Sequence, residues 1–209
     1  MKGRLFKTTI AGVALVALSA TMVAAAGGAQ KSVRATPGTV IITGTVTGIG
    51  GTGSRAWSMP LFGATITVQD AAETATTAVD GTYSLIATVS AAPYSGKTIT
   101  ATRALYKTGK KLLGDGNPQV QTFRLTVKST KFQVTVKSGS KKIKGATVAC
   151  FGKSATTNGS GVATLSGLQL KPQTAYTVKI TKSGYKTMPF TAMSSPGGTV
   201  TFTKSISKN

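Results

Sequence analysis

The sequence of 209 residues predicts an all-β protein, in which two small antiparallel β-sandwich modules follow a cleaved signal peptide in tandem. Three observations support this prediction: a basic and then apolar N-terminus, alternation of apolar and polar residues with period two, and one long pattern that occurs twice. Period-two alternation rich in Thr and Val is typical of half-buried antiparallel strands. No convincing amphipathic helix follows the N-terminal apolar run.

The N-terminus has the three regions of a secretory signal peptide. An uncharged apolar run of about 17 residues, up to Ala26, follows the basic residues Lys2, Arg4 and Lys7, and Ala24 and Ala26 fit the A-x-A cleavage pattern. We predict a signal peptide over residues 1–26, with cleavage after Ala29 as the alternative, and a flexible lead-in over residues 27–37. A retained membrane anchor is the other interpretation, but the run is short and only weakly apolar, so we expect no transmembrane span in the mature chain.

The repeat divides the mature chain into two modules. The first copy runs from Gly63-Ala64-Thr65-Ile66 through Thr77 to Leu85, and the second runs from Gly145-Ala146-Thr147-Val148 through Thr157 to Leu165. The two starting glycines are 82 positions apart (145 minus 63), so the repeating unit is a whole small domain and not a solenoid unit. We therefore predict modules over residues 38–128 and 129–209.

Alternating rows of apolar residues mark the strands in both modules. The predicted inward rows are Ala64, Ile66 and Val68; Tyr83 and Leu85; Phe123, Leu125 and Val127; Phe132, Val134 and Val136; Ala146, Val148 and Cys150; Tyr176, Val178 and Ile180; and Val200 and Phe202. Turn signals such as Asn158-Gly159 and Ser183-Gly184 separate these rows, and this spacing indicates a sandwich.

The order of the motifs resembles the carboxypeptidase-regulatory-like, or prealbumin-like, family of Ig-like β-sandwiches. The second module has the G-A-x-V strand, the turn from Thr157 to Gly161 and Gly184-Tyr185, whereas in the first module Tyr106 follows Leu105 and not Gly. The resemblance implies about seven strands in each module and says little about chemistry. The related collagen-adhesin B-type repeats often carry a Lys–Asn isopeptide bond beside an acid. We expect no such bond here, because the second module has no carboxyl side chain and no Lys lies between Pro37 and Gly96.

Composition argues against catalysis and cofactors. The chain has no histidine, which removes the usual general base and the commonest metal ligand. One cysteine cannot form a zinc site or an intramolecular disulfide, and a secreted protein without disulfides is ordinary for bacteria. We expect no enzyme activity, no cofactor and no metal. Asp115-Gly116-Asn117 is read as a plain turn, with a calcium-binding loop as the alternative.

The charge is strongly one-sided. Lys and Arg total 25 against 4 acids, and removal of the three signal-peptide cations leaves 22 minus 4, or +18. No acid follows Asp115, and 12 lysines lie between Ser129 and the end. Such a field attracts polyanions and weakens with salt. The predicted polyanion-binding residues are Lys141, Lys142, Lys144, Lys179, Lys182 and Lys186 in the second module, and Lys107, Lys110 and Lys111 in the first.

Three single residues have two readings each. Trp57 lies in a Gly- and Ser-rich stretch and either caps the sandwich or stacks on a sugar ring. Cys150 is in register with core residues, and an intermolecular disulfide is the alternative. Asn158-Gly159-Ser160 reads as a tight turn or as a glycosylation acceptor.

The leading hypothesis is a secreted, non-catalytic bacterial surface protein that associates with anionic envelope polymers or acidic glycans. Nucleic acid fits less well, because secretion removes most such targets and no aromatic-rich platform is visible. The first alternative is a protein-interaction or assembly module that docks a surface protein through flat strand edges such as Thr199 to Thr203. The second alternative is a glycan-binding accessory module that uses Trp57.

Overall fold

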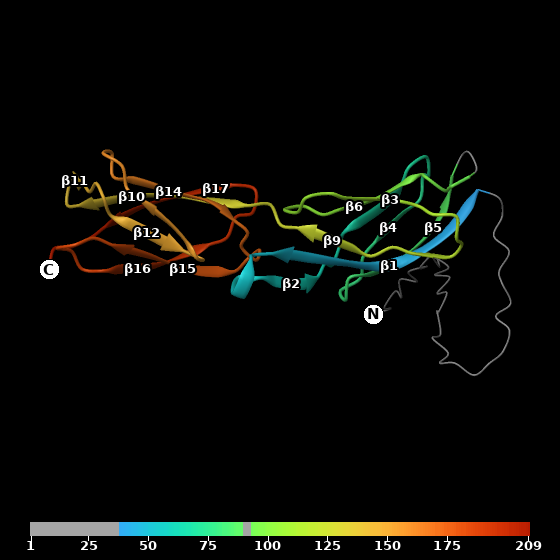
Figure 1. Ribbon diagram of the computed structural model, residues 1–209, viewed down its shortest axis with the longest axis horizontal. Coiled ribbons are helices and arrows are strands. Elements are labelled where there is room, and N and C mark those ends of the chain that lie inside the picture. The colour runs from blue at the N-terminus through green and yellow to red at the C-terminus, as the bar shows by residue number, and fades with distance from the viewer. Residues whose placement is uncertain (1–37, 90–92) are drawn as a thin grey trace, which may run out of the picture. The chain divides into compact units, whose positions relative to one another are not determined.

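The computed structural model describes residues 38–89 and 93–209 and is built almost entirely from β-strands (Figure 1). The single helical element in these residues is a 3₁₀ turn, η1 (Gly53–Arg55). No helix in the described ranges is long and apolar enough to cross a membrane. The predicted all-β fold with two tandem sandwiches is confirmed, and the predicted signal peptide and lead-in lie outside the described residues.

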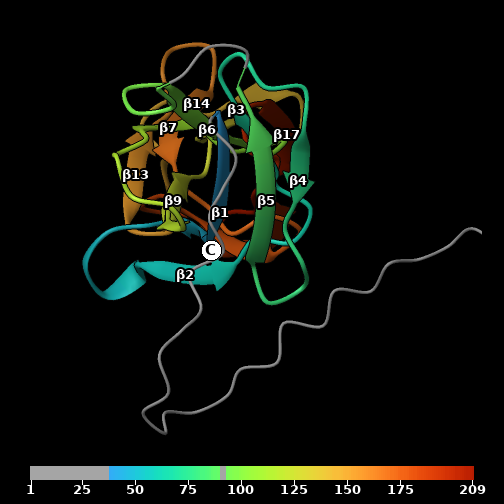
Figure 2. The ribbon, with the colours of Figure 1, turned by 90° about the vertical axis from the view of Figure 1, so that its right-hand side faces the viewer.

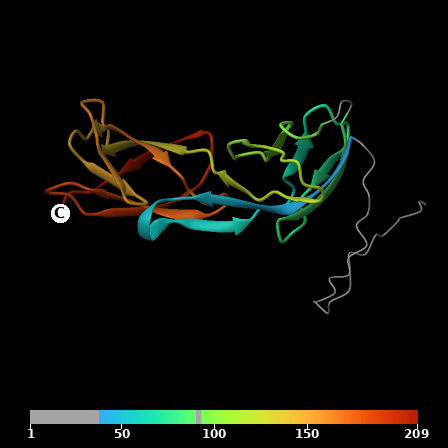
Figure 3. The ribbon, with the colours of Figure 1, turned by 45° about the vertical axis from the view of Figure 1, so that its right-hand side comes forward.

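The first sheet of the first sandwich is organised around β1 (Thr39–Gly50). The strand pairs antiparallel with β5 (Thr82–Thr88) along its first half and with β2 (Trp57–Pro60) along its second half. Figure 2 shows β5 beside β1, and Figure 3 shows β2 running along the end of β1. On its other edge β1 pairs in parallel with β8 (Gln119–Val120) and β9 (Phe123–Thr126).

The facing sheet has the strand order β4-β3-β6-β7. Its strands are β3 (Thr65–Val68), β4 (Thr74–Thr76), β6 (Thr98–Thr102) and β7 (Gly109–Leu112), all paired antiparallel. Between the two sheets lies the first core, to which the predicted rows of β3, β5 and β9 contribute.

The second sandwich, over residues that the structure describes throughout, repeats this topology except that no strand corresponds to β8. One sheet holds β10 (Thr130–Ser138), β11 (Lys141–Lys142), β14 (Val162–Leu168) and β17 (Thr199–Ser205). The other has the order β13-β12-β15-β16, with β12 (Thr147–Cys150), β13 (Lys153–Thr156), β15 (Ala175–Thr181) and β16 (Met188–Met193). A separate core fills this sandwich.

The pairing is not antiparallel throughout, which corrects the sequence-based expectation. The last strand of each module, β9 or β17, pairs in parallel with the first, β1 or β10. In each module the chain leaves the opposite sheet after β7 or β16 and then runs beside the first strand in the same direction, through β8 and β9 or through β17, and not through a hairpin. Alternation along a strand identifies a half-buried face and carries no information on the direction of the neighbour.

A buried threonine fixes the same turn in both modules. The Oγ1 atoms of Thr77 and Thr157 each accept a hydrogen bond of 2.8 Å from a core amide, those of Ala64 and Ala146 respectively. Each hydroxyl also donates to a carbonyl, that of Leu61 or of Ile143. These hydrogen bonds explain why the turns over residues 77–81 and 157–161 begin with threonine.

The glycine that ends each turn is required by space and by backbone conformation. Gly81 and Gly161 have φ values of 80° and 73°. An added methyl group would lie 2.6 Å from the Val46 carbonyl oxygen at Gly81 and 2.8 Å from that of Val136 at Gly161. The T-x-x-x-G pattern is therefore a structural signature of this turn.

Candidate functional site

The three lysines predicted at one turn of the second module are exposed and adjacent. Lys141 and Lys142 form β11, which pairs with the end of β10, and Lys144 follows two residues later. Lys142 lies directly opposite Lys137 of β10. Like charges opposite one another across strands are destabilising, so this cluster is electrostatically costly to the isolated fold.

Lys182 joins this cluster, whereas Lys179 and Lys186 lie on other elements. A methyl group added at Gly145 would lie 2.9 Å from the Nζ atom of Lys182, which places this ammonium beside the residue that follows Lys144. Lys179 is exposed on β15, opposite Ala149 of β12. Lys186 is exposed after the Gly184 turn, and its amide donates to the Ser207 carbonyl.

The first-module lysines are exposed around β7. Lys110 and Lys111 lie on this strand, and the Lys107 amide donates to the Thr126 carbonyl. The Nζ atom of Lys111 is 5.6 Å from the centroid of the Phe123 ring, within the range of a cation–π contact. These three residues belong to the first sandwich, whereas the β11 cluster belongs to the second.

None of the nine predicted lysines has an acidic partner within the described residues. The ion pair found there joins Lys97 and Asp70, with Nζ and Oδ2 2.6 Å apart. Two of the other acids accept hydrogen bonds within the protein. Hydrogen bonds from Thr82 lower the pKa of Asp80. Backbone hydrogen bonds, including one from Thr88, lower the pKa of Glu73. The lysine charges are therefore available to an external anion.

Trp57 is the first residue of strand β2, although the Gly- and Ser-rich stretch around it indicated a loop. Its Nε1 atom donates a hydrogen bond of 3.0 Å to the Gln169 carbonyl. A methyl group added at Gly50 would lie 2.5 Å from the indole ring, so the ring packs closely on β1. These contacts are those expected of a cap, and the sugar-stacking role of Trp57 stays a prediction.

Cys150 is a core residue, as the sequence predicted. Its side chain is buried and the thiol is free, and burial raises its pKa to about 11. The thiol is therefore protonated and unreactive at neutral pH. Asn158 forms the expected turn, because its Oδ1 atom accepts the amides of Ser160 and Val162. No cluster of metal-ligating side chains occurs in the described ranges.

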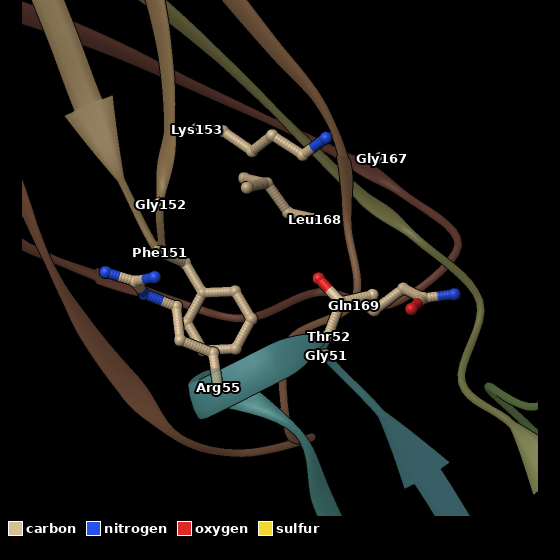
Figure 4. Close-up of a pocket in the computed structure, with 9 residues that line it drawn as sticks. All are labelled: Gly51, Thr52, Arg55, Phe151, Gly152, Lys153, Gly167, Leu168 and Gln169. Atoms are coloured by element: carbon tan, nitrogen blue, oxygen red, sulfur yellow. The ribbon is translucent and has the colours of Figure 1, made fainter.

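A hollow of about 240 Å³ lies beside the turn between β12 and β13, and sequence reasoning did not find it. Figure 4 shows the Phe151 ring in this hollow, with Arg55 of η1 on one side and Lys153 and Leu168 on the other. Its remaining lining residues are Gly51, Thr52, Gly152, Gly167 and Gln169. The one available sequence signal was an aromatic residue directly before a glycine at a hairpin turn.

Comparisons with known proteins show likeness at the level of the fold. The chain is similar to the Bacillus anthracis TIE protein, with 18% identity over 82% of this chain and 34% of that chain, and a TM-score of 0.50. It also matches GBS52, the minor pilin in Gram-positive Streptococcus agalactiae, with 15% identity over 81% of this chain and 96% of that chain, and a TM-score of 0.30. This chain thus spans about a third of the matched TIE chain.

No family model and no curated protein matches the chain. The resemblance to the prealbumin-like family therefore stays a prediction, and the likeness to the TIE protein supports the fold alone.

Proposed function

We propose that this protein is a secreted, non-catalytic bacterial surface protein that binds anionic envelope polymers or acidic glycans through its lysines. The observation that carries the proposal is the set of nine lysines, mostly exposed and without acidic partners in the described part of the chain. Lysine is a compact point charge without the planar fork of arginine, which favours electrostatic contact with a polymer over bidentate recognition of one group.

The proposal includes the predicted processing and division of the chain. The signal peptide over residues 1–26 directs secretion, the lead-in covers residues 27–37, and the modules cover residues 38–128 and 129–209. The likeness in fold to a protein of Bacillus anthracis supports a bacterial source for this fold.

Retention on isolated envelopes across a salt series tests this function. We expect the mature protein to bind at low salt and to be released at moderate salt, since screening weakens exposed charge pairs. Replacement of Lys141, Lys142 and Lys144 by Gln should lower the salt concentration needed for release. The matched control replaces Lys128, Lys131 and Lys208 by Gln, which removes the same charge elsewhere. Equal effects of the two triple variants would show that the β11 cluster is not the binding surface.

A second candidate function is strand-edge docking at β17. This strand pairs with β10 along one edge, and no strand of the described residues pairs with its other edge. Val200 and Phe202 on β17 are only half-buried, whereas Phe123 and Leu125 on the corresponding strand β9 are buried. Docking at this edge predicts a defined oligomer or complex that persists in high salt, measured by light scattering after size-exclusion chromatography. A monomer at all salt concentrations would favour the polyanion function.

A further inference from the structure

We propose that the hollow beside the β12–β13 turn is a subsite for one anionic sugar unit of a polymer. The Phe151 ring would lie against the apolar face of the sugar, and Arg55 and Lys153 would hold its carboxylate or phosphate. This inference rests on the proposed function for its ligand class, and it adds a site and a recognised unit that the lysine set does not contain.

Phe151 has an unfavourable backbone conformation at this turn. Cys150 of β12 pairs with Lys153 of β13, so Phe151 and Gly152 form a two-residue hairpin loop. Their φ values are 48° and 75°, and positive φ at both central residues is the type I′ pattern that Asn-Gly satisfies best. A bulky aromatic residue is strained in this conformation. Strain kept in place at a hollow is an observation from which a functional role can be inferred.

Contacts within the protein cover only part of the Phe151 ring. The Phe151 and Tyr176 rings meet edge to face, with centroids 5.3 Å apart and planes at 81°, so Tyr176 holds the ring in position. Phe151 itself is only half-buried against the second core. The rest of its ring faces the hollow, as Figure 4 shows, and is free to contact a ligand.

Two cations without a counterion in the described residues lie beside the Phe151 ring. Arg55 lies against the turn, because a methyl group added at Gly152 would be 2.9 Å from its Nη1 atom. Arg55 and Lys153 are exposed, and neither makes an ion pair within the described ranges. Arginine presents a planar fork that matches carboxylate or phosphate oxygens, in contrast to the surrounding lysines.

The hollow continues along the turn into a second one. A second, more open hollow, of about 390 Å³, shares Arg55, Phe151, Gly152 and Lys153 with the first and continues past Ser154 and Thr177. The polar residues Thr52 and Gln169 also line the first hollow. Polar groups and one aromatic face suit a hydroxylated polymer that passes over the turn. A nucleic acid strand would call for several stacking aromatic side chains.

Binding of a decamer of galacturonate to the mature protein, measured by calorimetry at low salt, tests the inference. Phe151→Asn should weaken binding roughly tenfold, the equivalent of about 1.4 kcal/mol, while raising the melting temperature because Asn suits the turn. A gain in stability with a loss of binding cannot arise from misfolding. Arg55→Gln should weaken binding by about tenfold or more, since a charge-assisted hydrogen bond is lost. Lys131→Gln removes the same charge elsewhere and should change affinity less than twofold.

Three other ligands identify what the subsite recognises. The methyl-esterified galacturonate decamer should bind much more weakly, because it lacks the carboxylates. Poly(glycerol phosphate) has the charge without the sugar ring, so its binding should not respond to Phe151→Asn. A phosphorylated hexose oligomer that responds to both substitutions would identify phosphate as the natural anion, and one that does not respond would identify carboxylate. Tighter binding of single-stranded DNA than of galacturonate would overturn the proposal.

Failure of this inference is distinguishable from failure of the proposed function. If the β11 triple variant is released early from envelopes but Phe151→Asn and Arg55→Gln bind galacturonate normally, the lysine function stands and the subsite is wrong. Equal weakening by Arg55→Gln and Lys131→Gln would also refute the subsite, because it would mean binding by overall charge. If galacturonate binding is lost in the subsite variants while the β11 triple variant is retained normally, the subsite stands and the lysine surface is wrong.

Discussion

Leu105 has the backbone conformation that the second module gives to a glycine. Its φ is 72°, against 77° at Gly184, and the carbonyl of each accepts a backbone hydrogen bond, from Lys128 at Leu105 and from Asn209 at Gly184. The turn that the sequence marks by Gly-Tyr is therefore present in both modules, although the first module lacks the glycine. A left-handed conformation costs an L-residue about 1–2 kcal/mol, so the first module carries strain at this position.

Replacement of Leu105 by Gly should therefore stabilise the protein, by roughly 0.5–1 kcal/mol after the entropy cost of glycine is subtracted. Leu105→Ala is the matched control, since it removes the side chain but keeps the Cβ atom that causes the strain. The reverse change, Gly184→Leu, should destabilise by about 1–2 kcal/mol. Chemical denaturation of the four proteins measures these differences. Equal stability of the Gly and Ala variants would mean that the conformation at this turn costs nothing.

At the scale of the element, the buried threonine ties a turn to the strand that enters the core. Thr77 and Thr157 are almost completely buried, and each hydroxyl satisfies one amide and one carbonyl. Valine has the same shape without the hydroxyl, so Thr77→Val or Thr157→Val would leave two buried polar groups without a partner. Each unsatisfied group costs about 1–3 kcal/mol.

We expect a loss of about 2–4 kcal/mol for either of these Thr→Val changes, which is two such costs of about 1–2 kcal/mol each. Thr76→Val and Thr156→Val are the controls, because they make the same chemical change at the exposed neighbours and should alter stability by less than about 0.5 kcal/mol. Thermal and urea unfolding measure all four variants. Similar losses at the buried and exposed positions would refute the role of the hydroxyl.

The strands also show how far the sequence predicts structure. Phe132, Val134 and Val136 are fully buried, as their alternation indicated. Phe202 on β17 has the same alternation but stays half-buried, because alternation identifies the inner face and not how well the opposite sheet covers it. The sequence did not predict the hollow, because Arg55 and Phe151 are distant in the sequence. The pairing of β12 with β13 and the course of η1 place them together in the folded chain.

At the scale of the whole molecule, the charge of the chain opposes its compact state. The sequence has 25 basic and 4 acidic residues, and the structure places Lys137 and Lys142 opposite one another on paired strands. The excess of positive charge follows from the amino-acid composition, and most of the predicted lysines are exposed in the structure. Each of the two sandwiches has its own apolar core, which stabilises it without a disulfide against this repulsion.

Low concentrations of salt should therefore stabilise the folded state of this protein. Between 10 and 150 mM NaCl the screening length falls from about 30 to about 8 Å, which removes most repulsion between exposed lysines. We expect the melting temperature to rise by a few degrees over this range, because self-repulsion is lost. The variant with Gln at Lys141, Lys142 and Lys144 should melt higher than the parent at 10 mM and respond less to salt. A melting temperature that stays constant or falls with salt would show that the lysines are too well solvated for their repulsion to matter, and the excess charge would then have to be explained by binding alone.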